Sequence, residues 1–253
     1  MVKRMSWNKI NNWYDDLVGQ KGHYYHKEVI FPNLLKLINI KDKKTSLIDL
    51  ACGQGALARN LDKEIQYLGV DNSKGLIEKA AKYNKNLNHK FILKDLSKKM
   101  EKSEKTFDIA TIILALQDID NPKNVLINAN NFLKKDGKLF IVINHPCFRI
   151  PRQSYWDINE NNKLQSRAIS TYMSEITIPI YNRPFKSRHS VSTNYYHLPL
   201  SSYFSFLKEA GFLVENIHEW VSNKISEGKN KKMEDRARKE IPLFLCIEAK
   251  KIN

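Results

Sequence analysis

The chain has 253 residues, of which 42% are apolar, and its 42 Lys and Arg residues exceed its 27 Asp and Glu residues to give a net charge of +15. One domain with an elaboration is favoured over two domains at this length. No apolar run approaches the ~20 residues that a membrane-spanning helix needs, and the first residues lead into polar sequence rather than the apolar core of a signal peptide. We therefore expect a cytoplasmic protein without a membrane span.

The positive charge leaves the kind of partner open. A strongly basic chain is typical of proteins that bind nucleic acid, provided that the charge gathers on one face. Here the excess is mostly Lys, scattered along the chain together with many Asn and Ile residues, which is also the composition that an AT-rich genome produces. The compositional explanation is favoured, and nucleic acid remains possible but less favoured as a partner.

Two helices are expected before the first strand. Residues 7–22 are polar with aromatic anchors, and residues 25–40 carry apolar side chains at helical spacing. Pro32 should kink the second helix or mark a new first turn. Ordinary helix packing is sufficient to explain Tyr14 and His26 in this region.

The rest of the chain is organised around residues 46–59. A short apolar run ends in Asp49 and is followed by Ala51, Gly53 and Gly55 before a helical pattern begins. This order predicts a strand, a tight loop and a helix start. A glycine has no Cβ, so its backbone can adopt positive φ and can approach a ligand closely. Amide groups at a helix start and a carboxylate at a strand end suit a ligand with an acidic and a cationic part.

Four further apolar runs follow, separated by helical patterns, at residues 67–71, 90–95, 107–116 and 137–144. Alternation of strand and helix favours a parallel sheet with right-handed crossovers. Asp71 and Asp95 end the first two of these runs, and Gln117 follows the third. Ligands of such sheets bind at the carboxyl ends of the strands. Asp49, Asp71, Asp95 and Gln117 are therefore predicted to share one site.

The pattern changes after the fifth strand. Residues 145–197 show no clear periodicity and are rich in Tyr, Trp, Arg and His, and stretches of this length are typical of lids and binding loops. A helix and two final strands, residues 212–220 and 242–250, are expected after it. The basic clusters at residues 229–232 and 236–239 are interpreted as a solvated linker between those strands.

At these residues the chain resembles the class I S-adenosylmethionine-dependent methyltransferases, in particular the bacterial group related to ubiquinone and menaquinone biosynthesis. The resemblance implies a Rossmann-like α/β fold with a seven-stranded, mostly parallel sheet, an antiparallel last strand and helices on both faces. It implies one domain over residues 1–253, built from four parts. These are a helical cover (1–44), a cofactor-binding core (45–145), a substrate lid (146–198) and a C-terminal helix with a strand hairpin (199–253).

The resemblance also implies roles for individual residues toward S-adenosylmethionine. Asp49, Gly53 and Gly55 would shape the site for the methionine part, and Ala51 stands where the family usually has its first glycine. Asp71 would bind the ribose hydroxyls. The full predicted cofactor-binding set is Tyr14 (near the methionine carboxylate), Asp49, Ala51, Gly53, Gly55, Asp71, Asn72, Asp95 and Leu96 (at the adenine), Leu114 and Gln117.

Methyl transfer from a sulfonium depends mainly on alignment of the acceptor with the methyl group. A general base is needed only if the acceptor is an alcohol, a phenol or a protonated amine. His145, directly after the fifth strand, and His197, at the end of the lid, are the candidate catalytic bases, with packing or solvation as the alternative for each. No metal is required, and three scattered cysteines without a C-x-x-C pair indicate reduced thiols.

The predicted function is methyl transfer to an O or N atom, possibly a C atom, of a small-molecule acceptor. An RNA (tRNA or rRNA) methyltransferase is an alternative, with Cys147 as nucleophile in a cytosine C5 enzyme, although a second Cys motif is missing. The sequence Leu116-Gln117-Asp118-Ile119 lacks the Pro-Pro-aromatic motif of enzymes that methylate base amino groups. A non-catalytic, cofactor-binding regulatory protein is the other alternative, and the oligomeric state is open.

Overall fold

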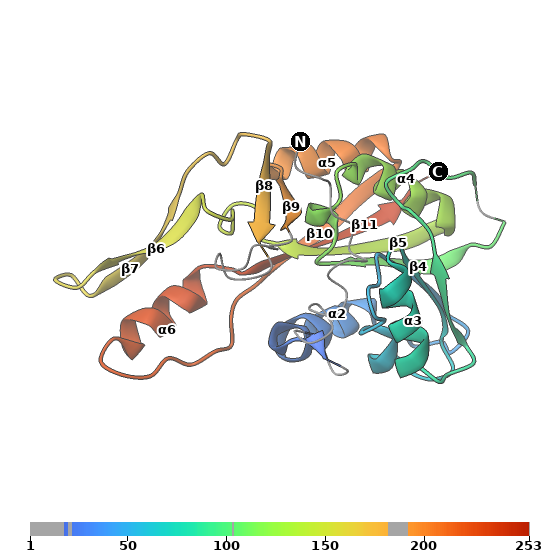
Figure 1. Ribbon diagram of the computed structural model, residues 1–253, viewed down its shortest axis with the longest axis horizontal. Helices are drawn as coiled ribbons and strands as arrows, with labels where there is room; N and C mark the ends of the chain where they lie inside the picture. The colour runs from blue at the N-terminus through green and yellow to red at the C-terminus, as the bar shows by residue number, and fades with distance from the viewer. Residues whose placement is uncertain (1–17, 20–21, 103, 182–191, 253) are drawn as a thin grey trace.

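A seven-stranded sheet forms the centre of the protein, in the order β10-β11-β5-β4-β1-β2-β3 (Figure 1). The structure is a computed structural model that describes residues 18–19, 22–102, 104–181 and 192–252. The strands of the sheet are β1 (Ser46–Leu50), β2 (Gln66–Asp71), β3 (His89–Leu93), β4 (Phe107–Ile113), β5 (Leu133–Asn144), β10 (Phe212–Trp220) and β11 (Phe244–Lys251). Strands β1 to β5 pair in parallel, and β11 is antiparallel to both β5 and β10. The predicted mostly parallel sheet with an antiparallel last strand is confirmed.

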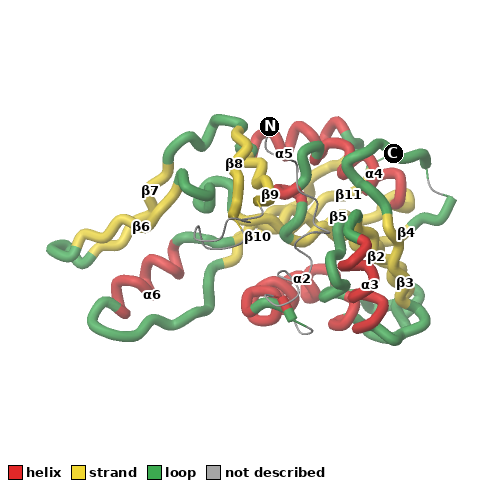
Figure 2. The backbone as a smooth tube through the Cα atoms, viewed as in Figure 1, coloured by secondary structure: helices red, strands yellow, loops and turns green. Residues whose placement is uncertain are grey.

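Helices cover both faces of the sheet (Figures 1 and 2). The helices and short helical turns are η2 (His26–Ile30), α2 (Phe31–Ile38), η3 (Ala58–Asn60), α3 (Lys74–Tyr83), η4 (Leu116–Asp118), α4 (Pro122–Phe132), α5 (Leu200–Glu209) and α6 (Lys231–Glu240). One apolar core joins α4 and α5 to the sheet, and a second joins α2 to the opposite face. Within the described ranges, no helix combines the length and apolarity needed to cross a bilayer.

The helix boundaries follow from local sequence. Ser73 caps α3 by accepting a hydrogen bond from the Leu76 N–H at 3.4 Å, and Asn121 caps α4 by accepting one from the Asn124 N–H at 3.1 Å. Pro32 lies in the first turn of α2, where its missing N–H costs nothing. Of the alternatives for Pro32, the new first turn is therefore observed.

The carboxyl edge of the sheet divides into two halves. The ends of β1, β2 and β3 form what we call the glycine-loop half. Asn144, Phe244 and Trp220 are neighbours in register, so the end of β5, the start of β11 and the end of β10 meet at the same edge. We call this second region the insert half, because the described residues of the insert, 146–181 and 192–198, lie beside it. Strand β4 separates the two halves.

The sequence of the insert suggested an irregular segment, but the insert contains regular strands. It forms two antiparallel hairpins, β6 (Ser154–Asn159) with β7 (Leu164–Ile169) and β8 (Ile176–Tyr181) with β9 (Ser192–His197). The first hairpin extends away from the sheet beside α6, and the second packs against η4 (Figure 1). Strand β6 has no regularly buried face, which explains why its periodicity was weak.

The basic segment before the last strand is a helix rather than a solvated linker. Met233 and Ala237, one turn apart, bury their side chains and give α6 a narrow apolar stripe. The first part of the predicted helical cover, including Tyr14, lies outside the described residues.

Candidate active site

The loop after β1 is built on left-handed backbone. Ala51, Gly53 and Gly55 have φ values of 59°, 55° and 70°. A Cβ on Gly55 would lie 2.7 Å from an atom of the Phe91 ring, so packing as well as conformation requires glycine there. The end of β1, where the sequence predicted a binding loop, therefore carries a tight loop of left-handed backbone that packs closely against Phe91.

Asp71 joins the glycine loop to the end of β2. Its Oδ2 accepts a hydrogen bond from the Gly53 N–H at 2.9 Å, and its Oδ1 accepts one from the Ser73 N–H at 2.8 Å. Burial raises the pKa of this carboxyl, and the backbone donors at Ser73, Gly53 and Asn72 oppose that rise. A carboxylate has about four acceptor positions, so about one remains after these three bonds. The neighbouring Asn72 is exposed.

Asp49 lies beneath the loop and is 3% exposed. It accepts hydrogen bonds from the Tyr67 hydroxyl and the Thr111 hydroxyl, both at 2.8 Å. Burial raises its pKa to about 7, although both hydroxyl donors act in the opposite direction. Its two donors come from the strands on either side of β1, so Asp49 ties β2, β1 and β4 together under the loop.

Asp95 and Leu96 follow the end of β3. Asp95 is half-buried and accepts hydrogen bonds at Oδ1 from the backbone N–H and the hydroxyl of Ser97, at 3.1 and 2.7 Å. Leu96 is buried, and its carbonyl accepts a hydrogen bond from Asn128 Nδ2 at 3.0 Å. Together they form a fixed turn beside the ends of β1 and β2, which agrees with the predicted shared edge.

Gln117 and Leu114 follow β4, at the boundary between the halves. Leu114 has a left-handed φ of 51°, an uncommon conformation for leucine that is often found at functional sites. Gln117 is 3% exposed, and its Oε1 has no hydrogen-bond partner among the described residues. The Oε1 of Gln54 in the glycine loop is likewise buried and unpartnered. Buried acceptors of this kind usually have a partner.

These observations fit S-adenosylmethionine. The glycine loop provides backbone at the end of β1, and Asp71 retains acceptor capacity for a hydroxyl group. The buried Oε1 atoms of Gln54 and Gln117 have no hydrogen-bond donor among the described residues. The cofactor carries ribose hydroxyls and an ammonium group that can donate to such atoms. In the described parts of the chain, no group of three His, Cys, Asp or Glu side chains could hold a metal ion.

Asp118 is a functional candidate that the sequence interpretation did not select. It is the last residue of η4, directly after Gln117, and its half-buried carboxyl accepts no hydrogen bond from the described residues. Burial raises its pKa to about 8. Burial is the main cause that raises the pKa values of the neighbouring phenols of Tyr195 and Tyr203, and the charge of Asp118 acts in the same direction. The sequence feature that could have identified Asp118 is the presence of an acidic residue shortly after the fourth strand.

His145 is held at the end of β5 through both ring nitrogens. Its Nε2 lies 2.7 Å from Glu219 Oε1, and its Nδ1 accepts a hydrogen bond from the Cys147 N–H at 3.2 Å. Because Nδ1 is the acceptor, a neutral ring carries its proton on Nε2 and donates it to Glu219. Burial lowers the pKa of His145, against the opposing effect of Glu219. Neither nitrogen of the neutral ring is then free to take a proton.

His197 ends β9, and its Nε2 lies 2.8 Å from the carbonyl oxygen of Tyr172, to which it must donate. Burial lowers its pKa as well. Tyr172 links the two histidine neighbourhoods, because its hydroxyl also hydrogen-bonds the side chain of Cys147. The structure therefore brings His145 and His197 into one cluster through Cys147 and Tyr172, without showing them on opposite sides of a common space.

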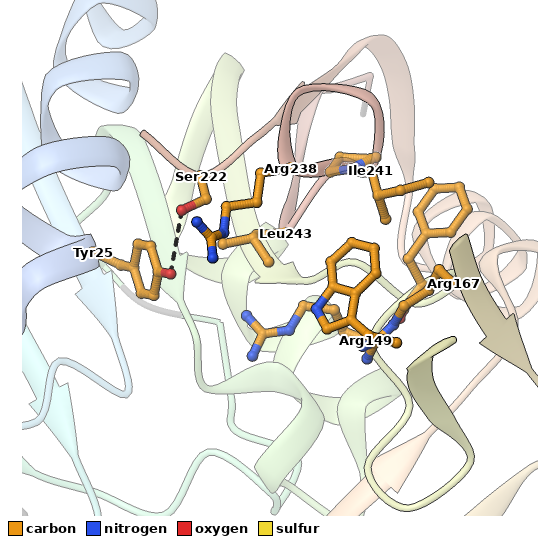
Figure 3. A pocket seen from close by; sticks show the side chains of 10 residues that line it. Tyr25, Arg149, Arg167, Ser222, Arg238, Ile241 and Leu243 are labelled. Atoms are coloured by element: carbon orange, nitrogen blue, oxygen red, sulfur yellow. Dashed lines mark hydrogen bonds between the residues drawn. The ribbon is translucent and has the colours of Figure 1, made fainter. Parts of the chain in front are cut away.

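A pocket of about 220 Å³ opens over the insert half (Figure 3). Its lining residues come from the N-terminal segment, the turn after β5, the β6–β7 hairpin, the segment after β10 and α6 with the turn that follows it. They are Tyr25, Phe148, Arg149, Trp156, Arg167, Ser222, Arg238, Ile241, Pro242 and Leu243. The N-terminal segment contacts both halves, because Gln54 Nε2 donates to the Gly19 carbonyl at 2.8 Å and Tyr25 lines the pocket.

Comparison with known proteins agrees with this geometry. A sequence profile described as a methyltransferase domain matches residues 41–182. No curated protein matches the chain. An S-adenosylmethionine-dependent methyltransferase from Mesorhizobium loti is 19% identical, with a TM-score of 0.67 over 87% of this chain and 96% of that chain.

Two further solved structures share the fold at lower identity. The glycopeptide N-methyltransferase MtfA, complexed with S-adenosyl-L-methionine, is 13% identical, with a TM-score of 0.57 over 86% of this chain and 91% of that chain. A Haloferax volcanii protein described as a methyltransferase, in complex with the Trm112 methyltransferase activator, is 12% identical, with a TM-score of 0.58 over 98% of this chain and 95% of that chain.

Proposed function

The chain belongs to the methyltransferase-domain family and is an S-adenosylmethionine-dependent methyltransferase, and from this premise we propose that it methylates an oxygen or nitrogen atom of a small-molecule acceptor. The observation that carries this proposal is the pocket at the insert half. It is lined by side chains of five separate segments, and its volume of about 220 Å³ suits a small ligand rather than a folded nucleic acid.

The surroundings of the lysines support the same proposal. Several lysines are paired with acids at separate places on the surface, such as Lys43 with Glu64 at 2.7 Å and Lys250 with Asp136 at 2.8 Å. Pairing with an acid neutralises these lysines and lowers their attraction for a phosphate backbone. The similar protein MtfA is named for methylation of a glycopeptide, so this fold accommodates acceptors other than nucleic acid.

We assign the cofactor to the glycine-loop half. Asp71 would accept hydrogen bonds from the ribose hydroxyls, and Gly53 and Gly55 would let the methionine part lie against the backbone. Asp95, Leu96 and Asn72 would adjoin the adenosine, with Leu114 and Gln117 at the boundary toward the acceptor. The bound cofactor supplies an activated methyl group on a sulfonium, so the protein's main task is to align the acceptor.

Asp118 is the general base that we propose for an acceptor that must lose a proton. It lies at the boundary between the halves, next to Tyr195 of the insert. A carboxyl with a pKa of about 8 is a stronger base than an ordinary aspartate and is suited to proton transfer near neutral pH. We propose His145 and His197 as positioning residues, because each has Nε2 engaged by an acceptor.

The insert, residues 146–198, is proposed as the cover of the acceptor. Its β8–β9 hairpin packs against η4, the turn that carries Gln117 and Asp118. Closure over this boundary would exclude water during transfer.

Methyl incorporation tests the proposed function directly. The protein is incubated with labelled cofactor and, separately, with a small-metabolite extract and with total tRNA and rRNA. We expect label in the small-molecule fraction. Label confined to RNA would instead establish the alternative acceptor class. Cofactor-product binding without transfer to either fraction would favour a regulatory protein.

A further inference from the structure

Two arginines in the pocket at the insert half carry charge that no acid balances. Arg149 and Arg167 have no ion-pair partner among the described residues, and the Arg167 side chain donates hydrogen bonds to neutral oxygens of Phe148 and Ser154. Burial is the main cause that lowers the pKa of each, and the charge of Arg149 further lowers that of Arg167. The two guanidinium groups are therefore close enough to repel each other.

The third arginine of the pocket provides a contrast. Arg238 on α6 lies 3.2 Å from Glu234 and 3.7 Å from Asp235, and it also donates to the Ser226 hydroxyl. Figure 3 shows the three arginines reaching the pocket from different segments of the chain. Only Arg238 is neutralised within the described structure. A half-buried cation without a counter-ion is unfavourable unless a ligand supplies one.

Both unpaired guanidinium groups are held in place. Arg167 donates from Nε to the Phe148 carbonyl at 2.8 Å and from Nη2 to the Ser154 hydroxyl at 2.7 Å, and it lies over the Trp156 ring at 5.2 Å. Arg149 lies over the Phe244 ring at 5.8 Å, and its guanidinium donates no hydrogen bond to the described residues. Arg149 thus has its donors available, and Arg167 contributes a fixed charge beside it.

The remaining lining combines apolar surface with one hydroxyl pair. Phe148, Trp156, Ile241 and Leu243 present rings and aliphatic groups, while the Tyr25 and Ser222 hydroxyls lie 3.3 Å apart (Figure 3). A simple inorganic ion would leave this apolar surface uncovered. The chemistry suits an oxyanion attached to a flat or apolar body.

We propose that the methyl acceptor is an organic oxyanion, a carboxylate or a phosphate, whose charged group is bound by Arg149 with Arg167 beside it. The inference rests on the proposed function, because it identifies the anion as part of the acceptor. Guanidinium groups bind carboxylates and phosphates through paired hydrogen bonds, which fixes orientation as well as charge. Tyr195 connects this anchor to the proposed base, since its hydroxyl donates to the Arg149 carbonyl at 3.5 Å and its ring lies near Asp118.

Calorimetry with three probes tests the anion site in the full-length protein, saturated with the demethylated cofactor product. The probes are benzoate, phenyl phosphate and the neutral isostere benzamide. We expect at least one anionic probe to bind about tenfold or more tightly than benzamide. The order of benzoate and phenyl phosphate then distinguishes a carboxylate from a phosphate acceptor.

Four substitutions connect that preference to the pocket. Arg149→Gln should remove the preference for the anion, with a loss of about tenfold to a hundredfold, and Arg167→Gln should weaken it by a smaller factor. Arg236→Gln is the matched control, since Arg236 lies on α6, is exposed and bonds the Lys163 carbonyl. It removes the same charge outside the pocket and should leave binding unchanged. Arg149→Lys keeps the positive charge but not the forked hydrogen-bonding geometry of arginine. It replaces Arg149→Gln in the calorimetry if that variant does not fold.

The outcomes separate this inference from the proposed function. Equal binding of benzoate, phenyl phosphate and benzamide, or undiminished anion binding by a folded Arg149→Gln protein, overturns the anion site. Methylation of neutral small molecules alone would then leave the proposed function intact. Anion binding that Arg149→Gln abolishes, combined with methyl label only on RNA, would retain the pocket's charge preference and refute the small-molecule acceptor.

Discussion

The two halves of the carboxyl edge are built by different means. In the glycine-loop half, left-handed backbone and buried carboxylates make the site, and each buried carboxylate is bonded by neighbouring strands or loops. In the insert half, long arginine and aromatic side chains from distant segments surround a pocket and leave charge unmatched. The difference suggests that the first half is adapted to one constant ligand, the cofactor. The second half can change with the acceptor through substitution of individual side chains.

Asp118 lies between the halves, and its substitution is expected to have the largest effect. Asp118→Asn keeps the shape of the side chain but removes the proposed base, so turnover should fall by about a hundredfold or more. In the parent protein, kcat should rise with pH and level off above about 8, the pKa of this carboxyl. The variant should lose that rise. Steady-state kinetics between pH 6 and 9.5 measures both effects.

Stability gives an independent readout of the same carboxyl. The folded pKa of about 8 exceeds the unfolded value, so the native state binds more protons between about pH 4 and 8 and stability falls as pH rises through that window. Asp118→Asn should therefore melt higher than the parent above pH 8 and equally near pH 4. Asp120→Asn, exposed two residues further on, is the control for both measurements. A pH profile of kcat that keeps its rise in Asp118→Asn would show that Asp118 is not the general base.

Asp71→Ala should distinguish ligand binding at the glycine-loop half from ligand binding at the insert half. The variant loses the proposed acceptor for the ribose and the bond to the Gly53 N–H, and the expected loss in affinity for the demethylated cofactor product is about tenfold to a hundredfold. Calorimetry is the direct measurement. Asp95→Ala should reduce cofactor-product affinity less, because Asp95 is half-buried and interacts with its near neighbours Ser97 and Lys98.

The same Asp71→Ala protein should still bind the anionic probes at the insert half. If binding of benzoate and phenyl phosphate disappears together with cofactor binding, the glycine-loop half and the insert half do not bind their ligands independently. Unchanged cofactor-product affinity would remove Asp71 from the site.

The sequence predicted the glycine-loop half well because its signals are local. Each strand of the parallel core is a short apolar run, and parallel strands buried on both faces are recognisable by such runs. Asp49, Asp71 and Asp95 stand at or next to strand ends, so the order of the sheet alone brings them to one edge. Left-handed backbone at Gly53 and Gly55 follows from residue type.

The insert half could not be predicted in the same way, because its features depend on distant segments. Tyr25, Arg149, Arg167 and Arg238 meet in one pocket although more than two hundred residues separate the first from the last. The β6–β7 hairpin lies over no continuous core, so its strands lack the alternation that marks a half-buried strand. Helix α6 is stabilised by a stripe of only Met233 and Ala237 within a charged sequence, which resembles a linker. An unpaired charge is likewise visible only once neighbours are known.

The smallest expected effect concerns Ala51, where the glycine-loop half departs from the glycine of the resembled family. Its φ of 59° is left-handed, which costs a residue with a Cβ about 1–2 kcal/mol. Ala51→Gly removes that cost, but it adds conformational entropy to the unfolded chain worth about 0.4–1 kcal/mol and loses a methyl group that packs partly against the core. These terms leave a net gain of about 0.5 kcal/mol, or about 1–2 °C in Tm for a protein of this size.

Ala58→Gly is the matched control, because Ala58 is buried without a left-handed φ, and it should destabilise by about 1 kcal/mol. Urea unfolding measures the change in unfolding free energy of each variant. The entropy that the added glycine gives to the unfolded chain is common to both variants and cancels in the difference between them. Equal destabilisation by the two substitutions would mean that Ala51 is not strained, and that the loop does not depend on left-handed backbone at its first position.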